Sequence, residues 1–159
     1  MNNHNDHTGQ SSNELYDRLS PDIRAKLSAH EQTSTVPAGE RLISHRECPR
    51  HLMIVNSGSV EISLPTGKRI VPVAVAAKGK VFGLRTLVSG SPAEIDVTAL
   101  EECELTLLPI SDVLEVLKQH PQMFLAIAQV LSADLKMVEA VLRQRTLSMA
   151  RRSPALAAG

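Results

Sequence analysis

The stretch from residue 35 to residue 109 constrains the fold most, because short runs rich in Val, Ile and Leu alternate there with turns containing Gly or Pro. Branched aliphatic side chains favour strands, whereas Gly and Pro favour tight turns. Val60, Ile62 and Leu64 alternate with polar neighbours, which is the period of a half-buried strand. The pattern predicts a β-sandwich or jelly-roll of about seven or eight short strands, at residues 41–43, 52–55, 59–64, 69–76, 80–82, 95–99 and 104–108.

Helices are predicted on the N-terminal side of these strands. Ser20, followed by Pro21 and an acidic residue, is typical of a helix start. We expect two short helices that join near Ser20 and end near His30, with a polar connection over residues 28–35. Apolar side chains recur every four residues along them, at Leu15, Leu19, Ile23 and Leu27. Residues 1–13 are polar and show no buried-face pattern, so we expect a disordered tail there.

The helical period returns after the last predicted strand. A short helix over residues 113–117, capped by Ser111, is followed by a long helix over residues 121–147 that a proline opens. The apolar side chains of the long helix are spaced as in a coiled coil: Phe124, Ala128, Leu131, Leu135, Val138 and Leu142. Ile127 and Val130 lie beside this heptad seam, so one side of the helix can cover the β-roll while the other forms a homodimer.

Composition excludes several classes of partner. The chain of 159 residues has a formal net charge of +0 and only 2% aromatic residues, so it lacks the positive charge and the stacking rings that nucleic-acid binding uses. No signal peptide and no run of about 20 apolar residues is recognised, so no membrane partner is expected. Two cysteines are too few for a disulfide framework, which favours the cytoplasm. The expected organisation is a β-roll with short flanking helices (14–120), the long helix (121–147) and a flexible tail (148–159).

Four segments carry a more specific signal: VPAGE at residues 36–40, LMIVNSGSV at 52–60, KGKVFG at 78–83 and CEL at 103–105. Together with the order of elements, they make residues 15–147 resemble the cyclic-nucleotide-binding domain of the catabolite-activator and FNR type bacterial regulators. The resemblance implies a mainly β fold with flanking helices, a double-stranded β-helix (jelly-roll) with a long C-terminal dimerisation helix. It also implies a regulator in which ligand occupancy shifts the long helix and repositions an effector.

Members of this family bind the nucleotide through a short set of residues, here called the cassette, and in this chain the cassette departs from the family pattern. In ligand-binding members, Gly-Glu-Leu or Gly-Glu-Ala is followed in the next loop by Arg-Ser or Arg-Thr; the Glu holds the ribose 2′-OH and the Arg neutralises the cyclic phosphate. The matching residues are Gly83, Leu84, Arg85, Ala93 and Glu94, so both charged positions have changed. A lost charge-assisted contact costs about 1.5–3 kcal/mol, so ordinary cyclic AMP binding is expected to be absent or much weakened. Arg85 could meet a different anion, although an exposed loop cation is the simpler interpretation.

Other constellations give weaker signals. His45, Cys48 and His51 have a spacing from which metal or haem ligands could come, but they lie in a loop and do not match a closed zinc motif, so no metal site is assigned. No nucleophile elbow, zinc-protease motif or phosphate-binding loop occurs, and catalysis is not expected. We expect Gly58 and Gly67 to close hairpins.

These patterns favour a non-enzymatic regulatory or sensor module that acts through contacts with an effector protein. We expect it to lack a DNA-binding domain, because only a short segment follows the long helix. The ligand is not determined by the sequence. Two alternatives with the same fold stay open: a ligand-free dimeric scaffold, and a haem- or metal-based sensor.

Overall fold

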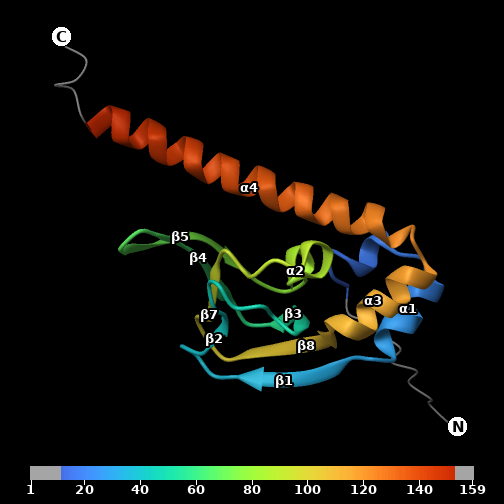
Figure 1. The fold of residues 1–159 in the computed structure, drawn as a ribbon. Helices are drawn as coiled ribbons and strands as arrows, with labels where there is room; N and C mark the ends of the chain where they lie inside the picture. Colours follow the sequence, from blue (N-terminus) through green and yellow to red (C-terminus); the bar gives the residue numbers. More distant parts are fainter. Residues whose placement is uncertain (1–11, 153–159) are drawn as a thin grey trace, which may run out of the picture.

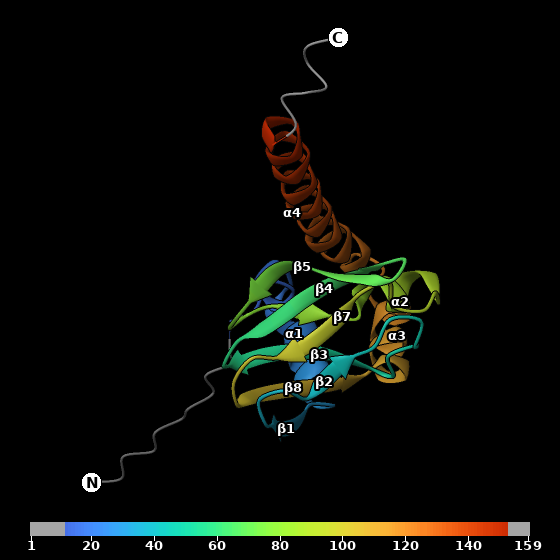
Figure 2. The same ribbon diagram turned by 90° about the vertical axis from the view of Figure 1, so that its left-hand side faces the viewer.

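The computed structural model describes residues 12–152, and their strands form two four-stranded antiparallel sheets that face one another (Figures 1 and 2). The first sheet has the order β1-β8-β3-β6 and the second the order β2-β7-β4-β5. The bounds are β1 Gln32–Val36, β2 Arg41–Ile43, β3 His51–Ser57, β4 Val60–Thr66, β5 Arg69–Ala76, β6 Val81–Phe82, β7 Asp96–Ala99 and β8 Cys103–Pro109. This arrangement confirms the predicted jelly-roll.

Helices cover one end and one side of the roll. A 3₁₀ turn, η1 (Tyr16–Arg18), precedes α1 (Pro21–Ser28), which lies beside α3 (Ile110–Gln119), while α2 (Leu84–Ser89) follows β6. The long helix α4 (Met123–Arg152) passes over α2 and the β4–β5 hairpin and continues beyond the roll (Figure 1). Near its far end, the guanidinium of Arg145 donates a hydrogen bond to the carbonyl of Pro72 in β5. Among the described helices, none combines the length and the apolar character needed to cross a membrane.

The core has two layers, and β3 lies between them. Leu52 and Ile54 point toward the helices, whereas Val55 points toward the second sheet. Such a strand is buried on both faces, which explains why it reads as a continuous apolar run rather than an alternation. Aliphatic side chains dominate both layers, and the rings that contribute are Tyr16 in the helical layer and Phe82 between the sheets.

The first strand departs from the prediction. Residues 28–35 were expected to form a polar connection, yet Gln32–Val36 form β1 and pair with β8 from Gln32↔Leu107 to Val36↔Cys103. Only Val36 of this strand is buried. An edge strand with one solvated face needs little apolar character, because its backbone hydrogen bonds come from the neighbouring strand. The spacing of apolar residues therefore did not predict strand β1.

Three further boundaries differ. Residues 1–11 of the expected tail lie outside the described residues, but Asn13 is buried, and its side-chain oxygen accepts hydrogen bonds from the backbone N–H groups of Leu15 and Tyr16. The helix α3 begins one residue before Ser111, with Pro109 at the N-cap, so the predicted Ser111 cap is wrong. The helix α4 continues to Arg152, past the expected end at residue 147, and residues 153–159 lie outside the described part.

The two glycines expected to close hairpins have different roles. Gly67 joins β4 and β5, which pair from Thr66↔Arg69 onward, so that prediction is confirmed. Gly58 joins β3 to β4, which belong to different sheets. The chain therefore crosses at Gly58 from one sheet to the other, and the segment that carries the family resemblance is a crossover rather than a hairpin.

Candidate functional site

A cavity of about 550 Å³ lies between the β-roll and the long helix. Strands β2, β4 and β6 contribute to its wall, together with the start of α2, the loop at residues 93–95 and one face of α4. All five cassette residues named from the sequence line it: Gly83, Leu84, Arg85, Ala93 and Glu94. The structure thus brings together the start of helix α2 and the loop that follows that helix.

Leu84 and Gly83 serve the packing of the roll. Leu84, at the position where the family carries a carboxylate, is 2% exposed and belongs to the core layer beneath the helices. Gly83 has φ +99°, and a Cβ there would lie 3.1 Å from the carbonyl oxygen of His51. A side chain at residue 83 would therefore be strained both by the backbone conformation and by the close approach of β3.

Arg85 and Glu94 form a two-point ion pair at the mouth of the cavity. The distance from Nη2 of Arg85 to Oε1 of Glu94 is 2.7 Å, and that from Nη1 to Oε2 is 2.5 Å. The hydrogen bond from Arg85 lowers the pKa of Glu94 from its usual value, so the pair stays charged at neutral pH. The one cation within the cassette is thereby neutralised by the residue at the family's Arg-Ser position.

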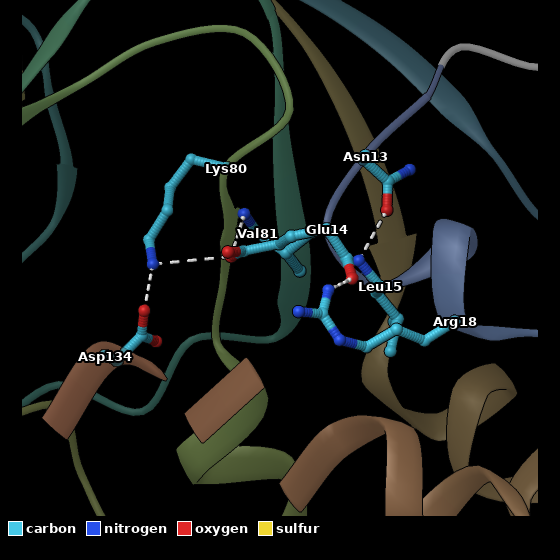
Figure 3. Close-up of polar contacts among 7 residues, drawn as sticks. All are labelled: Asn13, Glu14, Leu15, Arg18, Lys80, Val81 and Asp134. Carbon is cyan, nitrogen blue, oxygen red and sulfur yellow. Dashed lines mark hydrogen bonds and ion pairs between the residues drawn. The ribbon is translucent and has the colours of Figure 1, made fainter. Parts of the chain in front are cut away.

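A second cation, Lys80, joins three parts of the chain (Figure 3). Its ammonium lies 3.3 Å from Oε1 of Glu14 in the N-terminal segment and also contacts Asp134 on α4. Glu14 in turn accepts a 2.9 Å hydrogen bond from the backbone N–H of Val81. Since two carboxylates share one ammonium, this cluster carries a net negative charge. The three groups tie the N-terminal segment and α4 to the start of β6.

Replacing Lys80 by Met is expected to lower the free energy of unfolding by about 1–2 kcal/mol, because Glu14 and Asp134 then repel each other without a counter-charge. Both carboxylates reach solvent in part, which keeps the cost below that of a fully buried pair. Lys78→Met is the matched control, since Lys78 is exposed, and its effect should stay within about 0.5 kcal/mol. Urea unfolding measures both variants, and equal effects would contradict the bridging role of Lys80.

The seam of α4 is divided between the cavity and solvent. Leu131, Leu135 and Val138 line the cavity, and Leu131 also packs against the helical core layer. The other three seam residues, Phe124, Ala128 and Leu142, are exposed and lie outside the cavity wall, and Leu135 is exposed as well. The roll itself is covered by neighbouring positions of the helix, including Met123, Ile127 and Val130, all of which are buried. The helix therefore presents apolar side chains on two sides, toward the roll and toward solvent.

Several cavity residues were not identified from the sequence. Phe82 directly precedes Gly83 and lies under the ammonium of Lys80, which is 5.9 Å from the ring centroid. Ile95 follows the second cassette segment, and Met137 comes from α4. The available signal was that Phe82 lies within the KGKVFG segment and that Ile95 directly follows Glu94. Asp134 and Met137 had none, because only the docking of α4 brings them to the roll.

The His45, Cys48 and His51 constellation is spread over the connection between β2 and β3. Cys48 is exposed, and His51 is the first residue of β3. Over residues 12–152, no group of three or more His, Cys, Asp or Glu side chains is placed to hold a metal ion. Nothing in this part of the structure adds support to a metal centre.

Comparison with known proteins gives a consistent result. The profile of the cyclic nucleotide-binding domain family matches residues 33–120. A voltage-gated inwardly rectifying potassium channel of Gallus gallus is 30% identical over 97 residues, which are 60% of this chain and 8% of the channel.

Solved structures share the fold. The catabolite activator protein of Thermus thermophilus has a TM-score of 0.69 at 24% identity, covering 85% of this chain and 63% of that one. A cyclic nucleotide-binding domain from Methylobacillus flagellatus has a TM-score of 0.70 at 17% identity, covering 79% and 74% of the two chains. The chain thus spans a small part of the channel and just under two thirds of the activator protein.

Proposed function

The chain belongs to the cyclic nucleotide-binding domain family, and from this premise we propose that it is a regulatory domain that does not hold cyclic AMP in the usual way. In this proposal it works by binding rather than by catalysis. It forms a parallel homodimer through α4 and transmits its state by contact with an effector protein in the cytoplasm. It does not bind nucleic acid by itself.

One observation carries the proposal: the cations on the cavity wall are already paired. Arg85 is engaged by Glu94, and Lys80 is engaged by Asp134 and Glu14. A cyclic phosphate needs a cation that is free to make a charge-assisted contact. To make such a contact here, one of these ion pairs must break. The two positions at which other family members contact the ribose and the phosphate are Leu84 and Ala93, which carry no charge. Binding of a cyclic nucleotide in this cavity is therefore disfavoured.

Isothermal titration calorimetry with cyclic AMP and cyclic GMP tests this proposal directly. We expect no saturable binding of either nucleotide to the wild-type chain up to about 1 mM, and a Kd of that size corresponds to a standard binding free energy of about −4 kcal/mol. Saturable micromolar binding of either nucleotide would overturn the proposal.

Restoring the phosphate contact is expected to restore affinity for cyclic AMP. The double variant Ala93→Arg, Glu94→Ser supplies the family's Arg-Ser pair, and one charge-assisted contact corresponds to about 10- to 100-fold tighter binding. The matched control Ala93→Gln, Glu94→Ser removes the same carboxylate without adding the charge. Calorimetry should show the gain in the first variant and a much smaller change in the control. Equal behaviour of the two would show that residue 93 does not face the phosphate.

A further inference from the structure

We propose that the cavity takes one small, uncharged and mainly apolar molecule, with α4 as one wall of the site. The inference rests on the proposed function, because it assigns a ligand class to the cavity from which the nucleotide is disfavoured. It concerns the chemistry of the ligand, whereas the proposal above concerns only what the cavity rejects.

The first step is the composition of the wall. Aliphatic and aromatic side chains from the roll and from α4 form most of it, among them Ile43, Ile62, Phe82, Ile95, Leu131 and Val138. Ligand cavities in proteins commonly have volumes of about 300–1,000 Å³ and are mostly apolar, and this one of about 550 Å³ falls in that range. Water gains few hydrogen bonds against such a wall, so an apolar molecule can displace it favourably.

The second step is the state of the polar groups. Lys80 and Asp134 are paired with each other, as are Arg85 and Glu94, so the four charges on the wall balance in sign. The hydroxyl of Thr86 donates to the carbonyl of Ser91 at 2.9 Å. A charged ligand would lose its hydration without gaining an unpaired partner of opposite sign. An anion would also meet the extra negative charge of Glu14 beside Lys80. An uncharged molecule avoids both the loss of ionic hydration and the repulsion by Glu14.

The third step is the position of α4. Leu135 lines the cavity and is 60% exposed in the single chain, so an occupant would cover the part of this apolar side chain that faces the roll, while the proposed partner helix covers its outer part. The next turn toward the N-terminus contributes Leu131, which packs on the core layer beneath. A ligand in this place therefore contacts the roll and the helix together, and its binding free energy depends on how the helix is docked.

Two fluorescent probes that share one ring system test the ligand class. N-phenyl-1-naphthylamine is uncharged, and 1-anilinonaphthalene-8-sulfonate adds a sulfonate to the same rings. We expect the uncharged probe to bind once per chain with a Kd of roughly 10–100 µM, and the sulfonate to bind at least about tenfold more weakly. Equal or tighter binding of the sulfonate, or no binding of the uncharged probe, would overturn the inference.

Variants locate the probe. Ala93→Trp fills the cavity and should weaken binding of the uncharged probe by at least about tenfold. Leu64→Lys, which adds a charge to the wall on β4, should do the same and guards against a folding defect in the first variant. Leu125→Ser is the control, because Leu125 is exposed on α4 and lies outside the cavity wall. If Leu125→Ser lost binding while the wall variants kept it, the probe would lie on the outer face of α4 and the inference would be wrong.

The two failures are distinguishable. If cyclic AMP binds tightly to the wild-type chain, the proposed function falls and the inference falls with it. If neither nucleotide binds and the uncharged probe does not bind either, only the apolar ligand class is refuted.

Discussion

The double variant Leu135→Glu, Leu142→Glu is expected to be a monomer at concentrations where the wild-type chain forms the dimer that we propose. Both side chains lie on the predicted seam and are more than half exposed, at 60% and 52%, so a partner helix would bury them. Each leucine buried at an interface contributes about 1.5–3 kcal/mol, and the variant loses two from each chain. The dissociation constant should rise at least about a thousandfold. Multi-angle light scattering should then report the 17.2 kDa of a single chain.

Leu147→Glu is the matched control for the dimer. Leu147 is also exposed, but five residues after Leu142 it falls on the opposite side of a heptad helix. The same chemical change there should leave the dimer mass unaltered. A wild-type monomer, or dissociation in the control alone, would contradict the proposed seam. Leu131 is a poorer site for this test because it packs against the core, so its replacement would also weaken the fold.

Replacing Gly58 by Ala should destabilise the protein by about 2–5 kcal/mol. Gly58 has φ +86°, a conformation that an L side chain adopts at a cost. A Cβ would also lie 2.5 Å from the carbonyl oxygen of Glu102 and 2.7 Å from Sγ of Cys103. The carbonyl belongs to the backbone just before β8 and Cys103 is buried, so neither can move away cheaply. Urea unfolding gives the free energy that checks this value.

Gly67→Ala separates conformational strain from crowding. Gly67 also has a positive φ, +60°, but nothing lies within 4 Å of a Cβ built on it. Its replacement should therefore cost only the conformational strain, about 1 kcal/mol. If the two alanine variants were equally stable, the crossover at Gly58 would not be crowded by the segment that leads into β8.

Local patterns predicted most of the roll, whereas the cassette residues were named from the resemblance to a family. The strand β5 was predicted with its observed bounds, and the helix after the last strand was predicted from its period. The strand β1 was missed because its stability comes from pairing with β8, which lies far away in the sequence.

The electrostatic state of the cavity could not be predicted in the same way. The sequence offered Arg85 as a cation for a different anion or as an exposed loop cation, but its pairing with Glu94 depends on how α2 and the following loop fold back on each other. Lys80 and Asp134 are 54 residues apart, and no local pattern relates them. Charge pairs over such separations depend on which surfaces dock, and docking is decided by packing of the whole roll.

The sequence by itself determined that residues 35–109 form a roll and that a long heptad helix follows, and its resemblance to a family indicated that both charged positions of the cassette are changed. The roll and the helix depend on residue type and spacing alone, because a side chain's place on a strand or helix follows from its period. The tertiary structure decided that the cavity stays open beside a buried Leu84, that its cations are neutralised, and which face of α4 meets the roll. These properties arise only when segments distant in the chain come into contact.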